Sequence, residues 1–383
     1  MQTFHHPLLK EHHHALREQV RHFAETEIYP RVAELDEKAI FSEHLTRRMG
    51  ELGLFGMCIP EEYGGRNLDT LSYIIAVEEL ARIDGSQAVT VAAHNSLGLG
   101  PIDRYGTPEQ KKRYLPQLVD GTRLWAFGLT EPNAGSDAKN IATRADKTAE
   151  GWVINGEKIF ITNSSSSLAS GITLLACTGE QSGRKMYSTL LVESNTPGYK
   201  KEPILNKMMW RAADTGRVYF NNCKIPHENL LGEEGQGLRI MLETLDSGRL
   251  SIAAMGLGLA QGAYELAAKY AKKRVQFGKT LIQFQEISFK LAEMQVKLEL
   301  ARNTLYHACW LKDQGLPFGR EAAIIKLYTS EIAKEIADQA LQIHGGYGLI
   351  KSSDIERFYR DQRILQIGEG TSEILKLVIS KYV

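Results

Sequence analysis

The sequence lacks an excess of charge of either sign. Its 383 residues include 46 Lys and Arg and 46 Asp and Glu, so the formal net charge is zero. A protein that binds nucleic acid or an anionic membrane by electrostatics needs local positive charge, and no Lys/Arg-rich tail is present. The composition therefore argues against nucleic acid and against a membrane surface as the main partner.

Long hydrophobic runs are also missing. The most apolar stretch, residues 252–260, contains Gly256 and Gly258 and is about half the roughly 20 residues that a membrane span needs. The N-terminal segment MQTFHHPLLKEHHH has neither the apolar core of a signal peptide nor the Arg- and Ser-rich bias of a transit peptide. We therefore expect no membrane span and a cytoplasmic location.

Cysteine is scarce and dispersed. The four cysteines lie far apart, whereas zinc sites and redox motifs need close pairs, so we expect buried free thiols; they are Cys58, Cys177, Cys223 and Cys309. The run His12-His13-His14 suggests a metal site. Adjacent residues of a helix point in different directions, however, so the run is a poor ligand set and no metal is expected.

The sequence contains enough apolar residues for a large hydrophobic core, because 43% of the residues are apolar and 24% are charged. The length exceeds what one core usually supports, so we expect two or three domains. Residues 1–124 have helical periodicity, with an amphipathic run over 71–83. Thr107, Pro108 and Gln110 have the spacing of an N-cap, a first helical position and a capping box.

Residues 125–231 are predicted to form a compact antiparallel β domain. Short β-rich stretches cover 172–177, 188–192 and 218–220. Asn155-Gly156 lies between two alternating runs, which is the strongest short-range hairpin signal. We therefore predict a hairpin turn at this dipeptide.

Residues 232–383 are predicted to form an up-down helical bundle. Apolar residues step by four and three along two stretches, which is typical of helices that pack against one another. The first stripe is Ile287, Leu291, Met294, Leu298, Ala301, Leu305 and Ala308, and the second is Ile325, Tyr328, Ile332, Ile336, Ala340 and Ile343.

Four polar or glycine-rich segments could hold a ligand. The first is 129–137 (LTEPNAGSD), whose small residues let backbone N–H groups approach a ligand, and the second is 160–163 (FITN). The third combines 274–278 (RVQFG) with 342–348 (QIHGGYG), an arrangement that suits a phosphate. Each segment has an alternative reading as an ordinary loop, a strand end or a helix C-cap.

The fourth segment is 368–371 (GEGT), just before the terminal helix. Flanking glycines allow backbone angles that are closed to other residues, so they can aim the carboxylate of Glu369. Thr371 has the position of the N-cap of the last helix. The alternative is a solvated glutamate in a turn.

Taken together, these segments resemble the acyl-CoA dehydrogenase family. The resemblance rests on five motifs in family order across nearly the whole chain: Leu129-Thr130-Glu131-Pro132-x-x-Gly135-Ser136-Asp137, Gly156-x-Lys158-x-x-Ile161-Thr162-Asn163, Arg274-x-x-Phe277-Gly278, Gln342-x-x-Gly345-Gly346-x-Gly348 and Glu369-Gly370-Thr371. The run 245–261 is most similar to short-chain, butyryl-type members. The resemblance implies a mainly α fold with an N-terminal helical domain, an antiparallel β-barrel domain and a C-terminal four-helix bundle, assembled as a homotetramer.

The resemblance also implies FAD as the cofactor. One subunit would supply residues of its β domain and the start of its last helix, namely Phe127, Leu129, Thr130, Phe160, Thr162, Thr371 and Glu373. The neighbouring subunit would supply Arg274, Phe277, Gln285, Gln342, Gly345 and Gly346. Many members carry Trp where this chain has Phe160, which leaves less stacking area against the flavin.

The resemblance further implies an acyl-CoA substrate, with Glu369 as the base that removes the α-proton while the β-hydride passes to flavin N5. The substrate would contact Ser136, Asp246, Arg249 and Gly370. The segment 207–215, with Met208-Met209-Trp210, is bulkier than in other members and could reshape one wall near the substrate.

Three positions narrow the substrate class by comparison with relatives. Gly248 stands where isovaleryl and long-chain types carry their base, which leaves Glu369 for that role. Ala88 stands where glutaryl types carry an arginine, which disfavours a dicarboxylic substrate because a buried carboxylate would lack a partner. Gly98 is expected to leave the depth of the pocket open. We expect an uncharged short- or medium-chain acyl thioester, straight or branched.

The expected electron acceptor is an electron-transferring flavoprotein. Three alternatives share the fold: an acyl-CoA oxidase that uses oxygen, a dehydrogenase of acyl-carrier-protein thioesters, and a DNA-binding relative with little catalysis. The zero net charge argues against the last of these, and oxidases are commonly longer.

Overall fold

The computed structural model describes residues 6–383 and begins with a group of helices. They are α1 (Glu11–Phe23), α2 (Tyr29–Lys38), α3 (Glu43–Glu51), α4 (Thr70–Ala81), α5 (Gly85–Ala93), α6 (Gly100–Tyr105) and α7 (Pro108–Tyr114), with π-helical turns η1 (Ala24–Ile28) and η3 (His94–Leu99). Thr107 Oγ1 accepts the N–H of Gln110 at 3.2 Å, and Gln110 Oε1 accepts the N–H of Thr107 at 3.0 Å. This confirms the predicted capping box at the start of α7.

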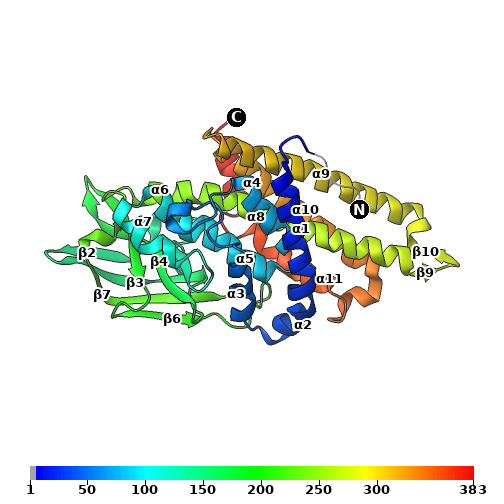
Figure 1. Ribbon diagram of the computed structural model, residues 1–383, viewed down its shortest axis with the longest axis horizontal. Coiled ribbons are helices and arrows are strands. Elements are labelled where there is room, and N and C mark those ends of the chain that lie inside the picture. The colour runs from blue at the N-terminus through cyan, green and yellow to red at the C-terminus, as the bar shows by residue number, and fades with distance from the viewer. Residues whose placement is uncertain (1–5) are drawn as a thin grey trace.

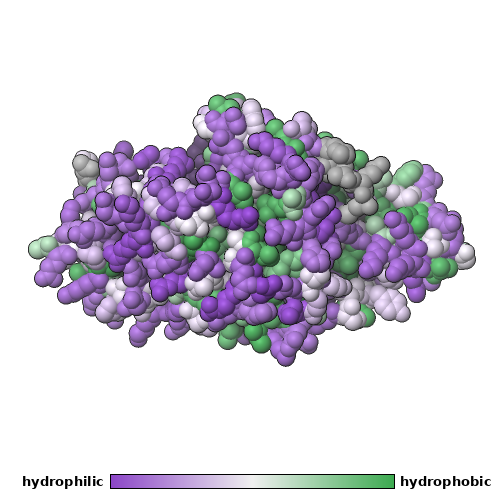
Figure 2. Space-filling view, viewed as in Figure 1, coloured by the Kyte–Doolittle hydropathy of each residue, from purple (hydrophilic) through white to green (hydrophobic). Residues whose placement is uncertain are grey.

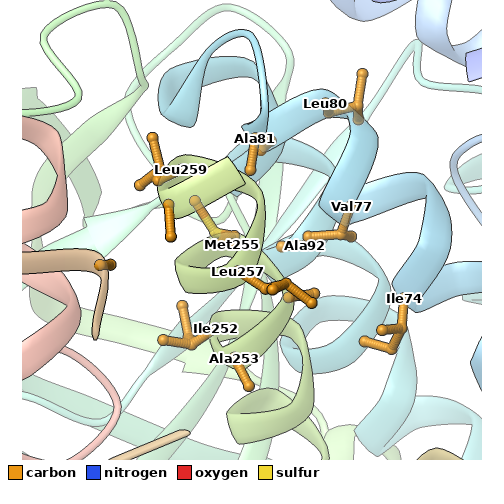
Figure 3. Packing of buried hydrophobic residues seen from close by; sticks show 14 of the residues in the cluster. Ile74, Val77, Leu80, Ala81, Ala92, Ile252, Ala253, Met255, Leu257 and Leu259 are labelled. Atoms are coloured by element: carbon orange, nitrogen blue, oxygen red, sulfur yellow. The ribbon is translucent and has the colours of Figure 1, made fainter. Parts of the chain in front are cut away.

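Helix α4 differs from the amphipathic helix that its sequence predicts. All of its residues are buried, because α4 packs against α1, α5, α8 and α9 at once. Figure 3 shows Ile74 and Val77 of α4 on the side of the helix that is next to α8 residues such as Leu257. A helix surrounded by other helices has no solvent face to keep polar.

The middle of the chain forms an eight-stranded sheet among the described residues. The strands are β1 (Leu124–Gly128), β2 (Arg144–Thr148), β3 (Gly151–Thr162), β4 (Ala169–Gln181), β5 (Arg184–Glu193), β6 (Tyr199–Pro203), β7 (Thr215–Ile225) and β8 (Leu230–Leu231). The order is β6-β7-β3-β2-β4-β5-β8, and β1 pairs with β4. The sheet occupies the left of Figure 1, apart from the long helices.

Two details of the sheet correct the prediction of an antiparallel barrel. Both β1 and β2 pair with β4 in parallel, whereas the other pairings described within this sheet are antiparallel. Along the described residues the pairings end at β6 and at the two-residue β8, so the sheet has two edges and is not closed.

The predicted hairpin turn at Asn155-Gly156 is wrong. Both residues lie inside β3, where the pairing with β7 shifts register between Ile154 and Gly156. A Cβ on Gly156 would lie 2.5 Å from Thr143 Oγ1, and Gly156 has φ 147°. The dipeptide therefore forms a bulge that only glycine fits, and the turn lies between β2 and β3 instead.

The C-terminal region is built on three long helices, α8 (Gly237–Lys273), α9 (Gln285–Asp313) and α10 (Gly319–His344). Between α8 and α9 lies a two-stranded ribbon of β9 (Val275–Gln276) and β10 (Lys279–Thr280), and α11 (Ile355–Asp361) and α12 (Ser372–Ser380) follow α10. Ile287 and Tyr328 are partly buried, and the other residues of the two predicted stripes are buried, which confirms their packing role. The order of helical, β and helical regions confirms the predicted fold class.

All four cysteines are free thiols, and Cys58 and Cys177 are only half-buried. Among the described residues, no helix is long and apolar enough to cross a membrane. Figure 2 shows that hydrophilic residues cover most of the visible face. Apolar residues reach the surface at the end with β9 and β10, where Phe277 is 94% exposed.

The N-terminal histidines lie closer together than predicted. The rings of His12 and His13 are 4.0 Å apart, and both Nε2 atoms face the carboxylate of Asp69, at 3.6 and 3.0 Å. The expectation that these adjacent side chains point apart is therefore wrong, because both turn toward Asp69. His13 Nδ1 accepts the N–H of Lys10 at 3.0 Å. Its Nε2 is then the protonated nitrogen, which leaves no lone pair there for a metal ion.

Candidate active site

Glu369 is half-buried in the turn that precedes α12. Its backbone is in the left-handed region, with φ 52°, and Gly370 follows with φ 100°. This left-handed turn is accompanied by a side chain whose Oε2 atom lies next to Gly248 of α8. The Oε2 atom of Glu369 is buried and has no hydrogen-bond partner among the residues that the structure describes.

The surroundings of this carboxylate favour proton transfer near neutral pH. Burial raises the pKa of Glu369 to about 7, although the cations of Lys326 and Arg249 act in the opposite direction. A base works best when its pKa is near the working pH. The unpartnered Oε2 therefore has a free lone pair, and the pKa of its carboxyl is close to a neutral working pH.

Helix α8 leaves room for the carboxylate at Gly248. A Cβ at this position would lie 2.2 Å from Glu369 Oε2 and 3.0 Å from Leu97 Cδ2. No side chain fits at Gly248 while Glu369 holds this position. Gly248 and Glu369 thus converge on one point from two segments of the chain.

The next residues of α8 form an ion pair beside the site. Arg249 is buried and donates through Nη1 to Asp246 Oδ1 at 2.6 Å, while its Nε has no partner among the described residues. Burial raises the pKa of Asp246, and Arg249 opposes this shift. Ser136 lies in the exposed loop after β1.

The loop after β1 is fixed by a buried ion pair. Lys158 on β3 donates to Glu131 Oε1 at 2.7 Å and to the carbonyl of Leu129 at 3.0 Å. Both charged side chains are buried, and burial lowers the pKa of Lys158 to about 8 against the opposing effect of Glu131. The N–H of Ile159 also donates to the carbonyl of Thr130, at 3.0 Å. The loop is thereby held along β3 at three points.

The predicted flavin residues of the β region lie together. Phe127, at the end of β1, and Leu129 pack in one apolar cluster. Phe160 on β3 has φ 61° and is 65% exposed, and Thr162 ends the same strand half-buried. A large exposed aromatic ring in a strained backbone conformation indicates a surface that another group covers.

A second group of predicted flavin residues surrounds the far end of α8 and α10. A cavity of about 470 Å³ is lined there by Arg274, Gly345, Gly346, Tyr347 and other residues. The guanidinium of Arg274 lies over the ring of Tyr347, 5.6 Å from its centroid. Phe277 sits at the tip of the ribbon, Gln285 begins α9, and Gln342 is in the last turn of α10.

These two groups do not meet within one chain. Along α8, a rise of about 1.5 Å per residue separates Gly248 from Arg274 by about 39 Å. Figure 1 shows β9 and β10 at one end of the molecule and the sheet at the other. A ligand that touches both groups must therefore bridge two chains.

The remaining predicted residues lie on α12. Thr371 Oγ1 accepts the N–H of Ile374 at 3.2 Å, which confirms Thr371 as the N-cap. Glu373 is exposed in the first turn of α12. The carbonyl of Gly370 accepts a hydrogen bond from Lys326 at 2.6 Å.

Three positions singled out in the sequence behave as packing residues. A Cβ on Gly98 would lie 2.6 Å from the carbonyl oxygen of Trp125. Gly98 therefore admits the backbone of β1, and the expectation that it opens a pocket is wrong. Ala88 is buried on α5. Trp210 is buried, and its backbone N–H donates to Asp361 Oδ1 of α11 at 2.8 Å, so the bulky segment is fixed against α11.

Sequence reasoning missed two residues at this site, Lys326 and Leu97. Lys326 is fully buried and interrupts the apolar run 322–327 (AAIIKL). A lone cation in an apolar stripe is a usable signal, since buried lysines need a partner. Leu97 carries no such signal, because only the fold brings η3 to α8.

Comparisons with known proteins cover almost the whole chain. Sequence-family models described as the N-terminal, middle and C-terminal domains of acyl-CoA dehydrogenase match residues 10–122, 126–223 and 235–383. The mitochondrial short-chain specific acyl-CoA dehydrogenase of Mus musculus is 44% identical over 372 residues, which are 97% of this chain and 90% of that protein.

Solved structures agree with this similarity. Butyryl-CoA dehydrogenase from Megasphaera elsdenii is 41% identical, with a TM-score of 0.95 over 100% of this chain and 99% of the other. A glutaryl-CoA dehydrogenase from Mycobacterium smegmatis in complex with FADH2 is 31% identical, with a TM-score of 0.92 over 98% and 95% of the two chains.

Proposed function

Because the chain belongs to the acyl-CoA dehydrogenase family, oxidoreductases that act on CH–CH bonds and use FAD, we propose that it converts a short- or medium-chain acyl-CoA to the trans-2-enoyl-CoA. The observation that carries this proposal is the unpartnered carboxylate of Glu369. Its Oε2 atom is buried, its backbone is in a left-handed turn, and burial raises the pKa of its carboxyl to about 7.

In the proposed reaction, Glu369 breaks the α-C–H bond of the thioester by taking the proton on its carboxylate. The backbone N–H of Glu369 polarises the thioester carbonyl, on which negative charge develops. When bound, FAD would supply the chemistry of a two-electron acceptor for the β-hydride. The protein's own task is to orient the thioester, exclude water and hold the removed proton.

The residues present fit FAD. Phe160 offers an exposed ring for a planar ligand, and Thr162 lies two residues further along β3. The loop carrying Leu129 and Thr130 is already ordered by Lys158, so little entropy is lost when it binds a ligand. Thr371 and Glu373 would complete the adenine-nucleotide side, as in similar proteins.

The second group of predicted flavin residues, around the far end of α8 and α10, fits the other part of the cofactor. Arg274 and the Gly345-Gly346 pair line one cavity, which provides a guanidinium and open backbone for a pyrophosphate. Phe277 is almost fully exposed, Gln285 is the first residue of α9, and Gln342 lies in the last turn of α10. Since this group is about 39 Å from Gly248 along α8, it would serve a neighbouring subunit. This supports an oligomer, and the resemblance to the family implies a homotetramer.

The substrate is proposed to be uncharged at its acyl end. The charged groups that act on Glu369 are Lys326 and Arg249, and Arg249 is already paired with Asp246. No arginine stands at position 88 to receive a distal carboxylate. Ser136, Gly370 and the Asp246–Arg249 pair would contact the thioester and CoA.

The proposed electron acceptor is an electron-transferring flavoprotein. Bound enoyl product would keep water and oxygen from the reduced cofactor. Turnover with that flavoprotein should exceed hydrogen peroxide production from the same substrate. Peroxide production at an equal rate would favour an oxidase.

Glu369→Gln tests the proposed base. The variant should bind FAD and acyl-CoA, because the amide has almost the same shape, yet reduce its flavin roughly 10²–10⁴-fold more slowly. Asp338→Asn changes an exposed carboxylate on α10 and serves as a matched control. Wild-type flavin reduction in Glu369→Gln would overturn the assignment of the base.

A further inference from the structure

Lys326 occupies an unusual place for a lysine. It is fully buried on α10, and its ammonium donates to the carbonyl oxygen of Gly370 at 2.6 Å. Gly370 directly follows Glu369, the proposed base. A buried ammonium loses its hydration, so it persists only where nearby groups compensate.

Lys326 is one of several α10 side chains that hold the turn containing Glu369. Ser330 donates to the carbonyl of Leu365 at 2.9 Å. Glu331 accepts hydrogen bonds from Gln366 at 2.7 Å and from Ser372 at 2.8 Å. The turn is therefore bracketed on both sides, and Lys326 makes the contact next to Glu369 itself.

This contact matters because the turn is strained. Glu369 is a non-glycine residue with φ 52°, a conformation that persists only when its surroundings enforce it. The hydrogen bond from Lys326 fixes the orientation of the peptide between Gly370 and Thr371. Loss of this bond would leave a carbonyl without its donor next to the base.

Lys326 also contributes the charge of a cation. The charged groups acting on Glu369 are Lys326 from α10 and Arg249 from α8, and both lower the pKa of its carboxyl. Arg249 is neutralised in part by Asp246. On the remaining side, Tyr73 of α4 is a phenol whose pKa burial raises well above its ordinary value, so it carries no charge there at neutral pH.

The lysine itself remains mainly protonated at neutral pH. Burial lowers the pKa of Lys326 to about 8, while Glu369 and Glu331 raise it and Arg249 lowers it. The negative charge of Glu369 in turn favours the protonated form of Lys326. The two groups titrate as a coupled pair.

We propose that Lys326 is a positioning residue for the proposed base: its hydrogen bond holds the Glu369–Gly370 turn, and its positive charge favours the ionised carboxylate of Glu369. This inference rests on the proposed function of Glu369. It assigns to Lys326 two separable effects, one on geometry and one on the charge state of the base.

Lys326→Met removes the charge and the donor while keeping a side chain of similar length. In the FAD-loaded enzyme, the rate of flavin reduction by butyryl-CoA should fall at all pH values. The acid limb of the pH–rate profile, where the rate falls as Glu369 becomes protonated, should also move to higher pH by about one unit. The reason is that a nearby opposite charge lowers a carboxyl pKa by roughly 1–3 units, and the variant lacks this charge. Lys326→Gln, also neutral, should move the limb in the same direction.

Ser330→Ala is the matched control on the same helix. It removes a hydrogen bond to the turn without changing charge. The variant should therefore lower the rate at most and leave the acid limb of the pH–rate profile in place. An acid limb that stays at the wild-type pH in both Lys326 variants would overturn the charge effect. An equal shift in Ser330→Ala would show that the turn alone sets the limb, which would also overturn it.

A second measurement needs no turnover. Water-soluble carbodiimide with an amine labels protonated carboxyl groups, and peptide mass spectrometry locates the label at Glu369. The pH at which labelling is half-maximal should rise by about one unit in Lys326→Met and Lys326→Gln. An unchanged midpoint would contradict the proposal even if either variant reduced its flavin poorly.

The same experiments separate this inference from the proposed function. If Glu369 is not the base, Glu369→Gln keeps wild-type flavin reduction, whatever the labelling shows. If Glu369 is the base but Lys326 does not act on it, Glu369→Gln is inactive while the Lys326 variants keep the wild-type acid limb and labelling midpoint.

Discussion

Gly248→Ala is a small change with a large expected effect on catalysis. The added methyl carbon would lie 2.2 Å from Glu369 Oε2 and 3.0 Å from Leu97 Cδ2. Ordinary contact begins at about 3.4 Å, so the carboxylate must move by roughly 1 Å. A displacement of about 1 Å at a reacting group can cost around 10²-fold in rate, which corresponds to about 2.7 kcal/mol in the barrier.

The assay is single-turnover reduction of the flavin by butyryl-CoA in a stopped-flow instrument. Alanine is favoured over glycine inside a helix by up to about 1 kcal/mol, so Gly248→Ala should not melt at a much lower temperature than the wild type. The neighbouring change Ser247→Ala, on another side of the same helical turn, should leave the rate within about twofold. Wild-type flavin reduction in a folded Gly248→Ala enzyme would refute the argument that Gly248 exists to admit the carboxylate.

Two further predictions concern buried charges. Lys158→Met should reduce FAD retention by at least about tenfold and lower the melting temperature, because it leaves Glu131 buried without its cation; flavin absorbance after dialysis measures retention, and the exposed Lys147→Met is the control. Asp361 has a pKa raised to about 7, with burial as the main cause and Asp84 contributing. A raised carboxyl pKa stabilises the fold below the unfolded value near 4, and this contribution is lost as pH rises through 7. Asp361→Asn, which keeps the acceptor for the Trp210 N–H, should therefore raise the melting temperature relative to wild type at pH 8 and much less at pH 5. Equal differences at both pH values would contradict this reasoning.

Local patterns in the sequence predicted much of the helical structure. The capping box at Thr107 and the apolar stripes of α9 and α10 depend on residues three or four positions apart, so the sequence contains all the required information. The N-cap role of Thr371 was predictable for the same reason.

The wrong predictions arose where one sequence pattern is compatible with two different local structures. Asn155-Gly156 has the composition of a hairpin turn, but the same glycine is needed where Thr143 approaches the backbone of β3. The sequence similarly suggested that Gly98 leaves open space in a pocket, whereas the carbonyl of Trp125 occupies the space beside Gly98. Deciding between these readings requires knowing which distant segment lies opposite.

The convergence on Glu369 could not be predicted from spacing. Gly248, Lys326 and Leu97 are far apart in sequence and meet only through the packing of α8, α10 and η3. Family resemblance identified Glu369 and Gly248 as relevant positions, but it did not identify Lys326.

The position of the two flavin groups at opposite ends of α8 has a thermodynamic consequence. If each cofactor contacts two chains, cofactor binding and subunit association are linked equilibria, and each must strengthen the other by the same factor. Dilution would then release flavin, and added flavin would oppose dissociation. In a mixed pair of one chain defective at Arg274 and one chain defective at Lys158, both defects would fall in the same cofactor site, so that the other site combines two intact halves and recovers activity.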